Sequence, residues 1–130
     1  MYGISNLASY WGAGVWGYTY GDVAGHGSFP WNAPEIYADR SPLFRADLIH
    51  TPLLLLHGMA DVNVPTNESE QLYTALEVLN RPVELVLFPG EDHGISGVWG
   101  RRAEHRTMML EWFDMYLKDQ PEAWNDRWGN

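Results

Sequence analysis

Two short apolar runs, separated by a helical segment, constrain the fold of this chain more than any other feature. Residues 53–57 (Leu-Leu-Leu-Leu-His) and 83–88 (Val-Glu-Leu-Val-Leu-Phe) have the length and composition of buried strands, and each ends at a turn that contains glycine. Residues 72–79 place apolar side chains at helical spacing, and this helix should end before Pro82. Because strand, helix and strand follow one another, we predict an α/β fold with a short parallel sheet flanked by helices.

The rest of the chain divides into a second helix and an irregular region. The last helix is expected to end at Pro121, to bury an apolar stripe and to expose an acidic side. The expected stripe is Met109, Trp112, Phe113 and Tyr116, and the expected solvated residues are Glu104, Glu111, Asp114 and Asp119. Residues 1–50 are rich in aromatic residues and glycine, lack helical periodicity over 1–21, and are expected to be irregular. We therefore predict a single domain region over 1–130, with strand-helix-strand-helix order in 51–120.

Composition excludes several classes of partner and scaffold. The 8 Lys+Arg against 17 Asp+Glu give a formal net charge of -9, so the chain lacks the basic surface that nucleic-acid binding requires. The chain has no cysteine, which excludes disulfides and thiolate metal sites. The longest unbroken apolar run, residues 53–56, is much shorter than a membrane span needs.

Two polar residues follow the two predicted strands and are the candidate catalytic residues. Asp61 comes shortly after the first strand and His93 shortly after the second. Open parallel sheets place their sites at the carboxyl ends of the strands. An acid that orients an imidazole, which in turn accepts a proton from a hydroxyl, is the partnership that serine acyl transfer needs. The order of acid and then histidine is the order that α/β-hydrolases use.

The same segments resemble the carboxyl-terminal part of a prolyl oligopeptidase family serine peptidase, over roughly residues 29 to 118. The matching motifs are Ser41-Pro42-Leu43, Thr51-Pro52 before the first strand, His57-Gly58 at its end, Asp61, Val64-Pro65, Gln71-Leu72, Pro89-Gly90-Glu91-Asp92-His93-Gly94, Arg102, Trp112-Phe113 and Tyr116-Leu117. The resemblance implies that this is the terminal portion of an α/β-hydrolase domain, with Asp61 as triad acid, His93 as triad base, a peptide substrate and no cofactor. It also places Met1 to Ile4 at the end of another strand.

The chain departs from that family where the nucleophile should be. The family carries its serine in a G-x-S-x-G elbow, and no such elbow occurs here. Ser96 has a glycine two residues before it but follows the histidine loop, so we do not expect it to be the nucleophile. We expect a fragment whose nucleophile and oxyanion hole precede Met1, and which is inactive when isolated.

Three alternatives stay open at this point. In the first alternative, the complete enzyme is an esterase or other acyl hydrolase of the same fold, because the substrate pocket sets which leaving group is accepted. Alternatively, the chain is a non-catalytic half-domain that self-associates through an unpaired sheet edge. A third alternative uses His57, Asp61, Asp92 and His93 as a metal site, although no ligand-spacing motif accompanies them.

Trp16 and Tyr18, with the aromatic residues around them, are candidates to line an apolar substrate pocket.

Overall fold

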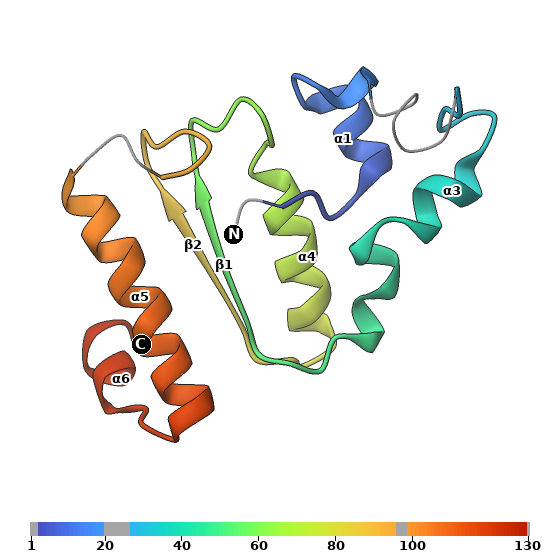
Figure 1. The fold of residues 1–130 in the computed structure, drawn as a ribbon. Helices are drawn as coiled ribbons and strands as arrows, with labels where there is room; N and C mark the ends of the chain where they lie inside the picture. The colour runs from blue at the N-terminus through green and yellow to red at the C-terminus, as the bar shows by residue number, and fades with distance from the viewer. Residues whose placement is uncertain (1–2, 20–26, 96–98, 130) are drawn as a thin grey trace.

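A computed structural model describes residues 3–19, 27–95 and 99–129 (Figure 1). In chain order its elements are α1 (Leu7–Ala13), the 3-10 helix η1 (Gly17–Thr19), α3 (Pro34–Asp39), the 3-10 helix η2 (Pro42–Leu48), β1 (Leu53–Gly58), α4 (Asn67–Val78), β2 (Val83–Phe88), α5 (Trp99–Lys118) and α6 (Glu122–Arg127). Among the described residues, no helix is both long enough and apolar enough to cross a bilayer.

The predicted strand pair forms the centre of the structure and confirms the α/β fold. β1 and β2 are parallel and in register, from Leu53 opposite Val83 to Gly58 opposite Phe88. Helices α5 and α6 lie on one side of this sheet, and α4 with the amino-terminal helices lies on the other (Figure 1). Because the strands run in register, the loops that follow them leave the sheet at the same edge.

Alternation along β1 divides the core into two clusters. Successive side chains of a strand point to opposite faces, so Leu55 and Leu56 enter different clusters. The cluster beneath α5 and α6 contains Leu56, Phe88, Ile95, Met108, Trp112 and Trp124. The cluster beneath α4 contains Ala46, Leu55, Leu72, Leu76 and Val83. A strand buried on both faces explains why its sequence is apolar throughout.

The amino-terminal region is more regular than we expected. It contains α1, α3 and two 3-10 helices, so the prediction of an irregular region was wrong for these segments. The Asn6 side chain caps α1 by accepting from the Ala8 and Ser9 amides. The fully buried Glu68 of α4 accepts from the Ser5 and Asn6 amides at 3.0 and 2.8 Å. These contacts join residues about sixty positions apart, which helical periodicity does not detect.

The expected strand end at residues 1–4 falls partly on residues outside those described. Gly3 and Ile4, which are described, do not lie in a strand.

The last helix departs from the predicted pattern on both of its sides. α5 does end before Pro121, and Trp112 is buried as expected, but Phe113 and Tyr116 are 51% and 41% exposed. Glu111, expected in solvent, is only 8% exposed. It accepts from Arg127 Nη1 at 2.8 Å and from Trp128 Nε1 at 2.5 Å. These partners of Glu111 lie in α6 and directly after it. We did not predict the helix α6.

Candidate active site

The loops after β1 and β2 are joined by backbone hydrogen bonds at the edge where both strands end. The Met59 amide donates to the Phe88 carbonyl at 2.9 Å, and the Ala60 amide donates to the Glu91 carbonyl at 2.8 Å. A Cβ atom at Gly58 would lie only 2.4 Å from the same Glu91 oxygen. Glycine at position 58 therefore permits the two loops to approach each other closely.

Asp61 is buried in the first of these loops, with both carboxylate oxygens engaged. Its side chain is 0% exposed. Oδ1 accepts from the amides of Asn63 and Val64, each at 2.9 Å. Oδ2 lies 2.8 Å from Nδ1 of His93. Two backbone amides thus orient one oxygen, so that the other faces the imidazole.

His93 lies in the second loop and is much more open to solvent. Its side chain is 36% exposed, and its amide donates to Asp92 Oδ1 at 2.7 Å. The chain then turns through left-handed backbone at Gly94 and Ile95, with φ of 108° and 48°. Ile95 is 1% exposed and anchors the loop in the core. Because an ionised carboxylate only accepts hydrogen bonds, Nδ1 carries the proton and Nε2 is the basic nitrogen of the neutral ring.

A third ionisable residue, His57, also contacts Asp61. It is fully buried in β1, and its Nε2 lies 3.3 Å from Asp61 Oδ2. Nε2 is also 2.7 Å from the Val64 carbonyl, and Nδ1 is 2.7 Å from Ser69 Oγ. From the sequence we expected His57 to be a strand-end residue or a metal ligand, and we did not predict its contact with Asp61. A polar side chain inside a strand buried on both faces was the available signal, because such a group needs buried partners.

No group of His, Cys, Asp and Glu suited to hold a metal ion occurs within 3–19, 27–95 and 99–129. Asp92, a member of the expected metal set, bonds to backbone amides: its Oδ1 accepts from His93 and, at 3.4 Å, from Val62. The alternative metal site therefore has no support from the described side chains.

The remaining described histidines are His50 and His105. His50 is exposed at the opposite end of β1, and His26 falls outside the described residues. His105 on α5 packs edge-on against Phe88, and burial lowers the pKa of its imidazole.

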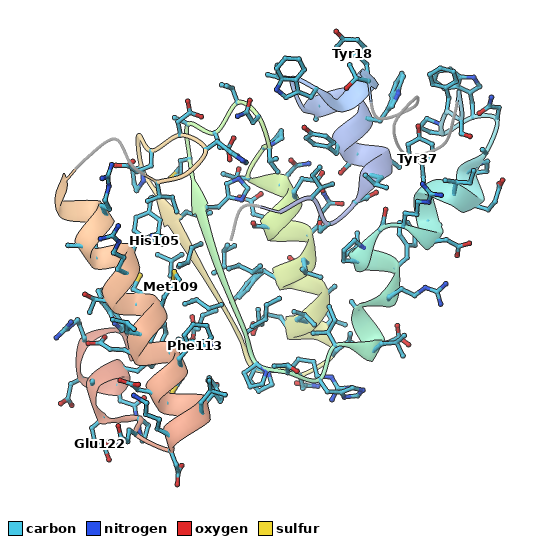
Figure 2. All side chains as sticks on the ribbon, in the orientation of Figure 1. Tyr18, Tyr37, His105, Met109, Phe113 and Glu122 are labelled. Carbon is cyan, nitrogen blue, oxygen red and sulfur yellow. The ribbon has the colours of Figure 1, made fainter. Side chains whose placement is uncertain are left out.

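The aromatic residues proposed for a pocket are not enclosed in the described structure. Trp16 and Tyr18 are 56% and 66% exposed, and Tyr18 projects from the outer end of the amino-terminal segment (Figure 2). Their assignment to substrate binding stays a prediction. Nearby, Trp11, Phe29 and Trp31 form a ring cluster, with Phe29 and Trp31 stacked at 4.9 Å.

The arrangement is that of a hydrolase-type α/β fold, with an aspartate and a histidine in the loops at the carboxyl ends of its parallel strands. Solved structures of this class are similar over most of the chain. An acylaminoacyl peptidase of Pyrococcus horikoshii superposes with a TM-score of 0.83 at 29% identity, covering 90% of this chain and 19% of that one. A puromycin-hydrolyzing peptidase of Mycobacterium tuberculosis gives a TM-score of 0.78 at 30% identity, covering 89% of this chain and 17% of that one.

Sequence comparison gives the family. The model of the prolyl oligopeptidase family matches residues 2–120, and the chain belongs to this family of serine peptidases. The curated relatives include a Bacillus subtilis protein described as the uncharacterized peptidase YuxL, which is 37% identical over 117 residues. The match covers 88% of this chain but only 18% of that relative. The chain therefore spans about a fifth of the length of the proteins that it resembles.

Proposed function

We propose that Asp61 and His93 are the acid and the base of a serine hydrolase triad in a peptidase. The observation that carries this proposal is the 2.8 Å contact between Asp61 Oδ2 and His93 Nδ1. A buried carboxylate that orients a partly exposed imidazole is the arrangement that activates a hydroxyl nucleophile. Membership of a serine peptidase family supports the same assignment.

In this proposal His93 moves the proton and Asp61 does not. Nε2 of His93 accepts the proton of the serine hydroxyl as Oγ attacks the carbonyl carbon, and then delivers it to the departing amine. Water then attacks the acyl-serine. His93 Nε2 takes the proton of this water and returns it to the serine Oγ as the acid product leaves. Asp61 holds the imidazole in the required tautomer and stabilises the imidazolium that forms.

We further propose that the serine lies outside these 130 residues and that the segment is one part of a larger catalytic domain. The described serines with assigned hydroxyl bonds are engaged elsewhere: Ser5 and Ser9 with Glu68, Ser41 with the Tyr37 carbonyl, and Ser69 with His57. Ser96, which we did not expect to be the nucleophile, lies outside the described residues. The isolated chain would therefore have the acid and base without a group for them to activate.

Covalent labelling tests this placement of the nucleophile. The isolated chain and the complete enzyme, meaning the product of the full reading frame that contains this segment, are incubated with a fluorophosphonate and examined by intact mass. We expect one adduct per complete enzyme, on a serine within G-x-S-x-G, and no adduct on the isolated chain. Stoichiometric labelling of the isolated chain would contradict the proposal.

Peptides are the proposed substrates of the complete enzyme. The names of similar proteins support peptide substrates: YuxL is called a peptidase, and a rat relative is called an acylamino-acid-releasing enzyme. The rat protein is 37% identical over 86 residues, covering 66% of this chain and 12% of that protein. Esters are the alternative within the same fold. A panel of matched peptides and esters separates the two: we expect kcat/KM to favour peptides, and turnover of esters alone would overturn the peptidase assignment.

A second proposal, self-association of the isolated chain, rests on its uncovered apolar surface. In the described sheet β1 pairs only with β2, which leaves its other edge unpaired. Beside it lies a groove of about 280 Å³, lined by Pro52, Leu53, Leu54, Leu56, Met109, Trp112 and Phe113. Unpaired edges and apolar patches favour association. Light scattering should find a dimer or larger species, reduced in size by Phe113→Glu, whereas a monomer would refute this proposal.

A further inference from the structure

His57 is a fully buried imidazole with both ring nitrogens engaged, and the triad chemistry proposed above does not use it. Nδ1 lies 2.7 Å from Ser69 Oγ, and Nε2 lies 2.7 Å from the Val64 carbonyl oxygen. It extends from β1, whereas Ser69 belongs to α4. The ring therefore bridges the strand that precedes the acid and the helix that follows it.

The partners of His57 fix where its proton is. A carbonyl oxygen only accepts hydrogen bonds, so Nε2 carries hydrogen and donates it to Val64. In the neutral ring Nδ1 then accepts from the hydroxyl of Ser69. This tautomer directs an N–H toward the loop that contains Asp61.

Two routes lead from that N–H to the acid. In the first, Nε2 holds the Val64 carbonyl, and the amide of the same residue donates to Asp61 Oδ1 at 2.9 Å. In the second, Nε2 faces Asp61 Oδ2 directly at 3.3 Å. The same oxygen, Asp61 Oδ2, accepts a hydrogen bond from His93 Nδ1 at 2.8 Å. Oδ2 thus contacts two imidazoles, and rotation of the carboxylate would weaken both contacts.

We propose that His57 is a positioning residue for Asp61, which holds the Val64 peptide and faces Oδ2 so that the carboxylate stays directed at His93. This rests on the proposed function, in which that carboxylate orients the base. A buried carboxylate without fixed partners pays a desolvation penalty, and a small misplacement of a catalytic group lowers turnover strongly. His57 thereby supports kcat without touching substrate.

Kinetics of three variants of the complete enzyme test the proposal. His57→Phe keeps the ring volume and removes both nitrogens, and we expect kcat to fall roughly tenfold to a hundredfold with KM unchanged. His57→Gln places an amide N–H near the position of Nε2, and should keep kcat within a few-fold of wild type. His57→Asn reaches only the Nδ1 position and should behave like His57→Phe. His50→Phe, at the exposed far end of the strand, is the matched control.

A spectroscopic measurement tests the same proposal without turnover. In proton NMR of the complete enzyme, the Nδ1 proton of His93 reports its hydrogen bond to Asp61. We expect this resonance to be retained in His57→Gln and His50→Phe, and to broaden or vanish in His57→Phe. Thermal unfolding is recorded for every variant. If His57→Phe does not fold, the comparison of His57→Gln with His57→Asn decides, and equal kcat values for that pair would overturn the proposal.

The outcomes separate this proposal from the function on which it rests. Loss of activity in His93→Ala together with unchanged kcat and an unchanged resonance in His57→Phe would overturn the role of His57 alone. Full activity in His93→Ala would overturn the proposed function. In that case the His93 resonance still decides whether His57 positions Asp61.

Discussion

Asp61 and His93 leave adjacent strands at one edge of the sheet, yet the two side chains are held in different ways. Asp61 is 0% exposed, and two backbone amides and two imidazoles surround its carboxylate. His93 is 36% exposed, and a short loop anchored by Ile95 presents its ring. Asp61 is fixed in place, and His93 is left accessible from solvent. In the proposed triad the base must reach a serine hydroxyl and needs that access, whereas the acid that orients the base needs rigidity.

The largest effect should follow from changing the acid while keeping its shape. In Asp61→Asn, the backbone amides still bind the side-chain oxygen, so the amide nitrogen faces His93 and donates to Nδ1. The imidazole then carries its proton on Nε2 and no longer serves as a base. We expect kcat of the complete enzyme to fall roughly ten-thousandfold. Steady-state hydrolysis of a peptide measures this, with Asp92→Asn as the carboxylate control, and a loss below tenfold would contradict the assignment.

An intermediate effect should follow from separating the two loops. Gly58→Ala introduces a Cβ atom 2.4 Å from the Glu91 carbonyl oxygen, which forces the backbone of one loop to move. We expect a destabilisation of about 1–3 kcal/mol in chemical unfolding, together with a lower kcat. Gly12→Ala is the control, because a Cβ there meets nothing within 4 Å and alanine favours the helix. Equal stability of the two variants would show that the close approach does not matter.

The smallest effect should come from the exposed aromatic residues. Trp16→Ala and Tyr18→Ala remove side chains that are 56% and 66% exposed, so stability should change by less than about 0.5 kcal/mol. If they line the substrate pocket, KM should rise or side-chain preference should shift while kcat is kept. Identical specificity profiles for wild type and both variants would remove these residues from the binding site.

The sequence predicted the parts of the fold whose signals are local. The strands, the helix between them and the glycine turns follow from apolar runs and spacing, and register then brings Asp61 close to His93. The helix α1 was missed because it is only seven residues long, contains a glycine and two aromatic residues, and is held partly by Glu68. Asn6 as a cap was the local signal that could have identified it.

The errors on α5 also arise because burial depends on contacts with other parts of the chain. Helical spacing identified Trp112 correctly, but it does not reveal what covers Phe113 or Glu111. Phe113 borders the open groove beside β1, and Glu111 is covered by α6 and Trp128. The role of His57 was missed for a related reason, since its partners Val64 and Ser69 are brought together only by the turn after β1.

Removal of the His93 imidazole tests most directly whether His93 is the base of a serine triad. Turnover of a blocked peptide by the complete enzyme is compared for wild type, His93→Ala and His50→Ala, with thermal unfolding to show that all three fold. With His93 as the base, His93→Ala should lose roughly ten-thousandfold in kcat, as Asp61→Asn does, while His50→Ala keeps wild-type activity. A folded His93→Ala enzyme with undiminished turnover would contradict it.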